Sequence, residues 1–383
     1  MVIDINVTST CNLACTYCSE GFECGLSTAY EENTSVTLAN IEDFMNRISD
    51  PKKEIYFWGG EPFVNYEFCR GVMEKYKDNP NYKFFFYTNG VYLKKYLKDL
   101  VAFHEAMPGR LNIQVSYDGK PVNDKTRIDK QGNPSSGMVK SNYLAAKNAG
   151  LAVKLKSVLT AEHFHLIYEA FLDVISLDEN YFPTPDMYSQ LTEEEFMPRL
   201  VALKEGLAKI AKHIYTNKLP PEKFGWFRQS RALCAAGINY MSVDLNGDIS
   251  PCHGCMYKES HSHTMGNIFK VADIDALIKE KSDMYRDALK DQPLGCQTCD
   301  SQFCMKCNAA TFEKSSKDTY LEKWTDHRAN WQVCKVFKQN EVVHYALRKA
   351  LNHKVLVNKA PVAESCTLSD EDREADRKTQ VLA

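Results

Sequence analysis

The chain has 383 residues, of which 44% are hydrophobic and 25% charged, so its composition is that of a globular protein and excludes a fibrous or wholly disordered one. Lysine and arginine number 47 and aspartate and glutamate number 50, and the net charge of −3 favours binding to neither nucleic acid nor a membrane surface. No apolar run is long enough to span a bilayer and no secretory signal opens the sequence, so we expect a cytoplasmic protein of two or three domains.

Segments typical of strands and helices alternate through the first half of the chain. The expected strands are residues 2–7, 54–58, 83–87, 112–117 and 152–159, and the expected helices are 37–48, 66–76, 91–106, 135–149 and 162–176. Residues 178–191 are too irregular to assign, although a sixth strand could lie there, and a long helix is expected over 192–217. Five β-α units in succession predict a parallel sheet with helical crossovers, in either a doubly wound sheet or a barrel.

Polar motifs follow four of these strands at their carboxyl ends. They are the segments Cys11–Cys18, Gly59–Pro62, Thr88–Gly90 and Ser116–Gly119. Each motif alone is also compatible with an ordinary tight turn built from Gly or Asn. In parallel α/β architectures, however, this edge of the sheet carries the active site, so we expect the four loops to meet in one site.

The 14 cysteines are distributed unevenly. In a reducing compartment such thiols more often bind metal or act in catalysis than form disulfides. Three lie at the start, eight lie in the second half, and Cys24, Cys69 and Cys366 stand apart; we expect Cys69 to pack like a small apolar residue in its helix. Residues 70–233 contain none, which indicates a division between domains.

The first group is Cys11, Cys15 and Cys18, separated by three and then two residues. Three thiolates on one loop can bind three irons of a cubane cluster, which leaves the fourth iron open to a reactive ligand. The alternatives at this point are a zinc site, with Cys24 as the fourth ligand, or free thiols in a loop.

This segment resembles the signature of the radical SAM superfamily, in which an aromatic residue, here Tyr17, precedes the third cysteine. The resemblance covers about the first 215 residues and implies an α/β fold, a partial (β/α)6 TIM-like barrel open on one side. It also implies contacts to S-adenosylmethionine (SAM): the Gly59-Gly60-Glu61-Pro62 loop at the amino group, Ser116 at the ribose, Arg127 near the carboxylate, Val158-Leu159 near the adenine, and Asn89 within the same site.

The resemblance further implies the chemistry, because the cofactor supplies it. The open iron chelates SAM, one electron from the reduced cluster cleaves the sulfonium, and the 5′-deoxyadenosyl radical abstracts hydrogen from an unactivated carbon. A flavodoxin or ferredoxin is the expected electron donor.

The second group comprises eight cysteines, enough for two four-cysteine sites, and their spacing alone is compatible with zinc or with iron–sulfur clusters. The arrangement resembles the SPASM extension of radical SAM enzymes, which holds two auxiliary [4Fe-4S] clusters, so three clusters are expected in all. The implied ligands are Cys234, Cys252 and Cys307 with Cys255 as candidate fourth ligand for auxiliary cluster I, and Cys296, Cys299, Cys304 and Cys334 for auxiliary cluster II. The central run is one residue shorter at each of two gaps than the usual pattern.

The catalytic residue itself is not evident from the sequence. His253 follows Cys252 at the position where sulfatase-maturating relatives carry an aspartate base, and it and Cys24 are the candidates, although a loop histidine is the simpler interpretation of His253. The expected organisation is a barrel over 1–217, a linker over 218–233, a cysteine-rich domain over 234–345 and a helix or disordered tail over 346–383. In the linker, Trp226, Phe227 and Arg228 either contact substrate or pack between domains.

The first functional hypothesis is a radical SAM/SPASM enzyme acting on a peptide or protein side chain, by crosslinking, epimerisation or oxidation to formylglycine. The alternatives are oxidation of a non-peptide small molecule and a metal-binding scaffold without turnover. The first strand begins at residue 2, so we expect any leader-peptide recognition to come from a separate protein.

Overall fold

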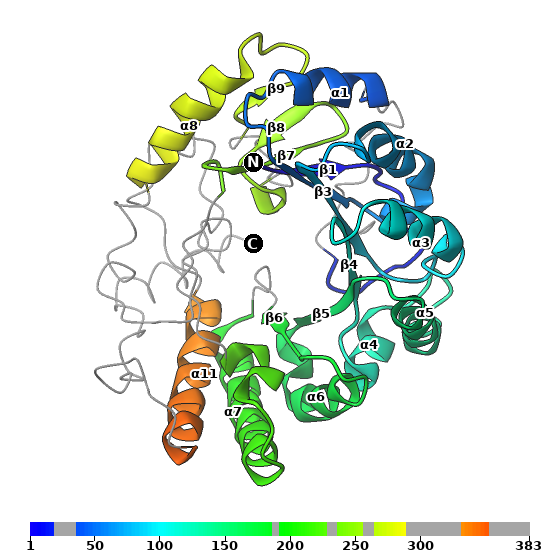
Figure 1. The fold of residues 1–383 in the computed structure, drawn as a ribbon. Helices are drawn as coiled ribbons and strands as arrows, with labels where there is room; N and C mark the ends of the chain where they lie inside the picture. The colour runs from blue at the N-terminus through cyan, green and yellow to red at the C-terminus, as the bar shows by residue number, and fades with distance from the viewer. Residues whose placement is uncertain (19–35, 186–190, 228–235, 256–263, 289–330, 352–383) are drawn as a thin grey trace.

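The computed structural model describes residues 1–18, 36–185, 191–227, 236–255, 264–288 and 331–351. Six parallel strands extend from one edge of a curved sheet, with helices on its outer face (Figure 1). The strands are β1 (Val2–Asn6), β2 (Lys53–Trp58), β3 (Tyr82–Thr88), β4 (Leu111–Ser116), β5 (Val153–Leu159) and β6 (Pro183–Pro185). The expected α/β class with a parallel sheet is confirmed, and the sixth strand lies in the stretch that the sequence left unassigned.

The helices lie close to the positions expected from their apolar spacing. They are α1 (Leu38–Asn46), α2 (Tyr66–Tyr76), α3 (Leu97–Ala106), α5 (Ser136–Asn148), α6 (Ile167–Ile175) and α7 (Glu193–Thr216). Helix α3 begins at Leu97 rather than at residue 91, because turns occupy the intervening residues. A short helix, α4 (Lys120–Thr126), was not expected; Pro121 lies in its first turn, where proline costs no hydrogen bond.

The two faces of the sheet differ in character because strand side chains alternate. One face packs under the helices and is apolar: its residues include Ile3 and Ile5 of β1, Phe84 and Phe86 of β3, and Leu155 and Leu159 of β5. Cys69 of α2 is fully buried in the same core, as expected of a thiol packing like a small apolar residue. The opposite, inner face carries polar and aromatic side chains.

The second half of the chain continues the same sheet. Strand β7 (Tyr240–Val243) pairs in parallel with β1, and β8 (Asp248–Ser250) and β9 (Gly266–Asn267) add antiparallel strands, giving the order β6-β5-β4-β3-β2-β1-β7-β8-β9. Two further helices follow, α8 (Ile274–Ala288) and α11 (Trp331–Ala350). The domain limits at 217 and 234 remain predictions, and the described part of the second half shares its sheet with the first.

Helix α11 lies beside α7 in Figure 1, and the segment expected to be a linker contacts both the sheet and α11. Trp226 is buried; its indole nitrogen donates to the carbonyl of Pro183, and its own carbonyl accepts from Asn340 Nδ2 at 2.9 Å. These contacts favour the packing interpretation of Trp226. The Phe227 side chain and Arg228 lie outside the described residues. No helix in the described part of the chain is both long and apolar enough to cross a bilayer.

Candidate active site

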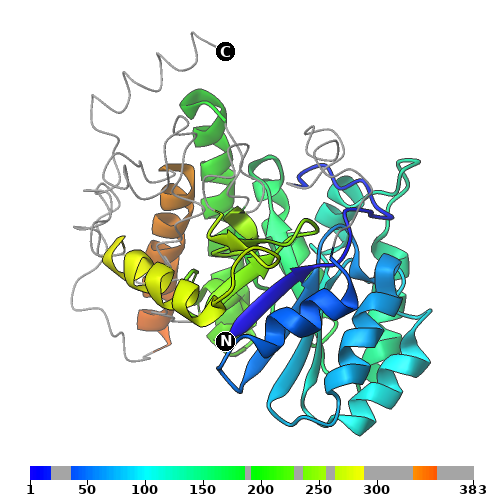
Figure 2. The ribbon, with the colours of Figure 1, turned by 90° about the horizontal axis from the view of Figure 1, so that it is seen from above.

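The loops that follow β1 to β5 meet at the carboxyl edge of the sheet. In Figure 2 the dark blue loop after β1 extends beyond the end of its strand and lies beside the segment after α4. Backbone hydrogen bonds join the two: Ala14 N donates to Ile128 O at 2.8 Å, and Thr16 N to Thr126 O at 2.9 Å. The cysteine loop is therefore fixed at its middle, between the first and third thiols.

The thiols of Cys11, Cys15 and Cys18 are each partly exposed. Cys11 Sγ lies 3.5 Å from the backbone nitrogen of Leu13 and 3.7 Å from Asn89 Nδ2, so two N–H groups point at this sulfur. N–H groups directed at sulfur suit a thiolate ligand, whose negative charge they stabilise. Asn89, expected in the cofactor site, thus lies against the first cysteine.

The two glycines after β2 allow a close approach of two backbones. Gly59 has φ +126°, and a Cβ on Gly59 or Gly60 would overlap with the carbonyl oxygen of Thr8 or Thr10, respectively. Gly60 N donates to Thr8 O at 2.8 Å and Glu61 N to Thr10 O at 3.0 Å. Because neither glycine carries a side chain, the two backbones can approach and form hydrogen bonds that hold the segment leading into the cysteines. Contact of this loop with the SAM amino group remains a prediction.

Glu61 points into the protein and is fully buried. Its carboxylate accepts hydrogen bonds from Phe63 N at 3.1 Å, from Thr88 Oγ1 at 2.7 Å and from Asn89 N at 2.7 Å. Burial raises the pKa of Glu61 to about 7, although these three hydrogen bonds oppose the shift. Glu61 thus connects the loop after β2 to Thr88, the last residue of β3, and to Asn89, which follows it.

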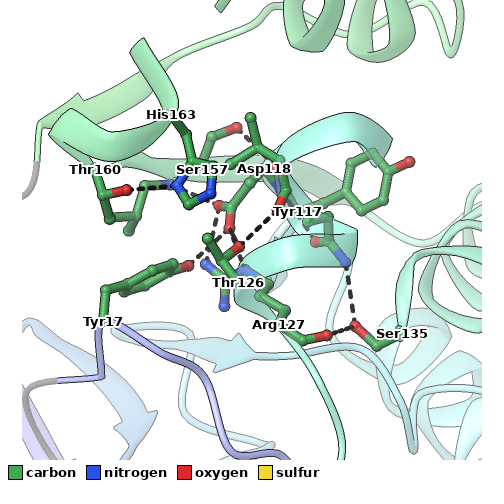
Figure 3. Close-up of polar contacts among 12 residues, drawn as sticks. Tyr17, Tyr117, Asp118, Thr126, Arg127, Ser135, Ser157, Thr160 and His163 are labelled. Atoms are coloured by element: carbon green, nitrogen blue, oxygen red, sulfur yellow. Dashed lines mark hydrogen bonds and ion pairs between the residues drawn. The ribbon is translucent and has the colours of Figure 1, made fainter. Parts of the chain in front are cut away.

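Asp118, directly after β4, lies at the centre of the polar network in Figure 3. It is fully buried and forms a two-pronged ion pair with Arg127, whose Nε and Nη2 lie 2.9 and 3.2 Å from its two oxygens. It also accepts from Thr126 Oγ1 at 3.1 Å and from Val158 N at 2.8 Å. One carboxylate therefore links the loops after β4 and α4 to strand β5.

Tyr17 connects this network to the cysteine loop. Its hydroxyl donates to Asp118 at 2.8 Å, and the Arg127 guanidinium lies 5.3 Å from the centre of its ring (Figure 3). Burial raises the pKa of the neighbouring Cys15 thiol, and the positive charge of Arg127 acts in the opposite direction. Sequence reasoning named Tyr17 and Arg127 but missed Asp118, the group that orders both. Its place in the Ser116–Gly119 motif was the available signal.

Ser116 and Leu159 occupy different surroundings at the ends of β4 and β5. Ser116 is partly exposed on the inner face. Leu159 is fully buried in the core under the helices, whereas Val158 is partly exposed on the other face. Val158 is therefore better placed than Leu159 for the expected contact with adenine, and that contact remains a prediction.

His253 contributes to a polar cluster on the inner face of β1. Its Nδ1 lies 2.8 Å from Asp4 Oδ2 and 2.8 Å from the Tyr240 hydroxyl, which also hydrogen bonds with Asp4. Its ring centroid is 5.0 Å from that of Trp58. Asp4 is fully buried, whereas the His253 side chain is 47% exposed. The histidine is therefore oriented by a carboxylate but remains accessible.

The described thiols suit an iron–sulfur cluster better than a single metal ion. No group of three or more His, Cys, Asp or Glu side chains within the described ranges is arranged to hold a single metal ion. A cubane requires a wider arrangement, because each thiolate binds a different iron. Three thiols on one fixed loop, with N–H groups at the first sulfur and a guanidinium near the second, fit the donor set that such a cluster needs.

The predicted auxiliary ligands are only partly described. Cys252 is buried next to β8, and Cys334 lies on α11 and is partly exposed. The backbone of Cys255 ends a short helical turn, but its side chain is not described. The remaining expected ligands and one catalytic candidate lie outside the described residues: Cys234, Cys296, Cys299, Cys304, Cys307 and Cys24. Their assignments remain predictions.

Comparison with known proteins gives the family of two parts of the chain. The model of the radical SAM superfamily matches residues 5–160, and that of the SPASM iron-sulfur cluster-binding domain matches residues 234–300. An uncharacterised protein of Methanocaldococcus jannaschii is 23% identical over 65% of this chain and 83% of its own length. The GTP 3',8-cyclase of Paenarthrobacter nicotinovorans is 31% identical over 40% of this chain and 42% of its own length.

Solved structures show the same fold. The anSMEcpe structure with bound AdoMet and Cp18Cys peptide has a TM-score of 0.66 at 17% identity and covers 92% of this chain and 98% of its own. Streptococcus suis SuiB, bound to the precursor peptide SuiA, has a TM-score of 0.56 at 16% identity and covers 84% and 75%. By the family models, residues 5–160 belong to the radical SAM superfamily and residues 234–300 to the SPASM iron-sulfur cluster-binding domain.

Proposed function

We propose that this protein is a radical SAM/SPASM enzyme that abstracts hydrogen from a peptide or protein side chain. The observation that carries the proposal is the cysteine loop, which is fixed at the carboxyl edge of a parallel sheet beside the Asp118–Arg127 pair. In this proposal Cys11, Cys15 and Cys18 bind a [4Fe-4S] cluster with one open iron. When bound, that cluster supplies the electron that converts SAM to methionine and a 5′-deoxyadenosyl radical.

The residues around the cluster then act by binding and orientation. Arg127 is proposed to face the SAM carboxylate, in an orientation set by its ion pair with Asp118. Ser116 is proposed to contact the ribose from the end of β4, and the Gly59–Pro62 loop to contact the amino group. Asn89 donates toward Cys11 Sγ and would stabilise the negative charge of that thiolate.

Two auxiliary clusters complete the proposed cofactor set of SAM and three [4Fe-4S] clusters, with the ligand sets given above. His253 is the better supported catalytic candidate of the two, because Asp4 orients its ring while the side chain stays accessible. We propose a flavodoxin or ferredoxin as the electron donor, and a separate protein as the source of any leader-peptide recognition.

A peptide substrate is supported by the fold relatives whose structures contain peptides, anSMEcpe with Cp18Cys and SuiB with SuiA. The outcome on this chain's substrate would be a crosslink, an epimerised centre or an oxidised side chain. Formylglycine formation is the least supported, because His253 stands where sulfatase-maturating relatives carry an aspartate. The second candidate is oxidation of a non-peptide small molecule, and the local similarity to GTP 3',8-cyclase supports the non-peptide substrate.

An anaerobic assay tests the proposal. Reconstituted protein with dithionite and SAM should release 5′-deoxyadenosine. Replacing Cys11, Cys15 and Cys18 together with Ala should abolish this release and remove about four irons per chain, whereas Cys69→Ala should keep the iron because that thiol lies in the core under α2. Absence of 5′-deoxyadenosine from fully loaded wild-type protein would reject the enzyme hypothesis.

Mass spectrometry of a candidate peptide after turnover then identifies the reaction. A crosslink or dehydrogenation removes two hydrogens, whereas epimerisation in deuterated water adds deuterium without another change. A substrate that proves not to be a peptide would favour the second candidate.

A further inference from the structure

Lys156, on the inner face of the sheet, has no acidic partner among the residues that the structure describes. Lys156 lies in the middle of β5, between Leu155 and Ser157, both of which point into the core. The Lys156 side chain therefore projects from the opposite face, the one that the helices do not cover. It is partly buried there, beside Ser116 in the paired strand β4.

The described surroundings of Lys156 provide an aromatic ring but no carboxylate. Its Nζ lies 4.0 Å from the centre of the Phe182 ring, and among the described residues no acidic side chain hydrogen bonds or pairs with it. Gly225 leaves room for the Phe182 ring, because a Cβ at Gly225 would overlap with it. Phe182 nonetheless remains 43% exposed.

A second lysine adds positive charge to the same face. Burial lowers the pKa of Lys156 to about 7, and the positive charge of Lys154, two residues away on the same face of β5, acts in the same direction. Two acidic residues on the inner face pair with other side chains: Glu54 contacts Tyr56 and Lys83, and Asp4 contacts His253. An ammonium group placed in a partly buried position without an acidic partner is unfavourable for folding and suggests a role in binding.

We propose that Lys156 binds a carboxylate of the substrate, with the Phe182 ring as the apolar wall of the same subsite. This proposal rests on the proposed function, because it places the subsite one strand from Ser116, the expected ribose contact. The carboxylate would come from an acidic side chain or from a peptide C-terminus. An ion pair with Lys156 would fix the substrate relative to the position where SAM is cleaved.

The experiment compares three short peptides on the cluster-loaded protein: acetyl-Gly-Glu-Gly-amide, acetyl-Gly-Gln-Gly-amide, and acetyl-Gly-Gln-Gly with a free C-terminus. Acetylation of each lysine by an N-hydroxysuccinimide ester is followed by mass spectrometry near neutral pH. We expect a peptide that carries a carboxylate to slow acetylation of Lys156 but not of the exposed Lys130. The Glu peptide and the free C-terminus distinguish the two sources of the carboxylate.

Two variants make the test specific. Lys156→Met should bind the carboxylate peptide about tenfold more weakly or worse, because one charge-assisted hydrogen bond is lost. Lys154→Met serves as the matched control on the same strand and face, with a smaller effect expected. Equal acetylation of Lys156 with all three peptides would overturn the proposal.

A parallel measurement separates this proposal from the general function. If Lys156→Met loses binding of SAM in the absence of any peptide, Lys156 contacts the cofactor and the carboxylate subsite is rejected. The acetylation readout does not depend on SAM cleavage, so a failure to form 5′-deoxyadenosine would count against the radical SAM function without affecting the result at Lys156.

Discussion

Glu61 illustrates how one buried carboxylate can make stability depend on pH. Its pKa is raised from 4.5 to about 7 by burial. Between those values the folded protein keeps a proton that the unfolded chain releases, so the free energy of unfolding falls as pH rises through this window. At about 1.4 kcal/mol per pKa unit, the loss is on the order of 3 kcal/mol.

The substitution Glu61→Gln tests this linkage. The variant cannot titrate at this position, so its free energy of unfolding should vary less between pH 5 and pH 7, as measured by chemical denaturation at a series of pH values. It should also be less stable, because a Gln amide would direct an N–H group at one of the donors that now serve Glu61. Glu67→Gln, at an exposed position on α2, is the control. An unchanged slope in Glu61→Gln would contradict the assignment.

Asp118 is the residue on which the order of the site most depends. Replacing it with Asn leaves the buried Arg127 without its carboxylate and should cost about 3–5 kcal/mol of unfolding free energy. Asp124→Asn is the matched control, because Asp124 pairs with Lys120 near the surface, where an ion pair contributes about 0–1 kcal/mol. Denaturant titration of both variants gives the comparison. Similar losses would show that the Asp118–Arg127 pair does not stabilise the fold.

At the scale of elements, the loop after β2 and the loop after β1 depend on each other. Gly60→Ala would place a methyl group against the Thr10 carbonyl and should displace the segment leading to Cys11. We expect a loss of iron from the cluster of Cys11, Cys15 and Cys18 while the helical content is kept, measured by iron analysis and circular dichroism.

Gly137 provides the control for that change. A Cβ at Gly137 meets nothing within 4 Å, and the residue lies inside α5. Gly137→Ala should therefore raise the free energy of unfolding by about 0.5–1 kcal/mol and leave the iron content unchanged. Full iron loading of Gly60→Ala would show that the close backbone approach is not needed for the cluster.

The sequence predicted those elements whose apolar residues follow a clear period. The strands β1 to β5 and most helices lie within a few residues of their expected limits, because their core residues alternate or recur on one face. Helix α4 has only seven residues and opens with a proline, and β6 reads Pro-Thr-Pro, so neither carries such a pattern. Neighbouring strands and loops fix these elements instead.

The site was predictable in its location but not in its internal contacts. Motifs at the ends of four strands predicted that the cysteine loop and Asn89 would meet, and Asn89 Nδ2 lies 3.7 Å from Cys11 Sγ. Arg127, which is near Cys15, was expected from the family resemblance and not from these motifs. The sequence could not show that Glu61 points inward or that Asp118 joins three segments, because those facts depend on contacts between residues far apart in the chain. The pairing of His253 with Asp4 is of the same kind.

At the scale of the whole molecule, the packing of α11 on α7 joins the last described segment of the chain to the half that contains the parallel sheet. Leu347 of α11 is 4% exposed, and Arg348 forms an ion pair with Glu222 at 3.0 Å. Leu347→Ala should lower the free energy of unfolding by about 2–5 kcal/mol, whereas Lys349→Ala on the exposed side should have little effect. Thermal unfolding of both variants checks this.

The form of the transition is also informative. Because α11 packs on α7 and β7 shares the sheet of β1, we expect Leu347→Ala to unfold in one cooperative step. A separate early transition for the second half of the chain would instead show that it unfolds independently of the parallel sheet.

The position of β1 also bears on how the protein is made. Val2 pairs on one side with Glu54 and on the other with Tyr240, so β1 lacks its second partner strand until β7, far later in the sequence, has been synthesised. Contacts so distant in sequence slow folding, and an unpaired strand edge is prone to aggregate. Chaperones that shield nascent chains should therefore improve the yield of this protein, and short translation products that end before β7 should be insoluble or rapidly degraded.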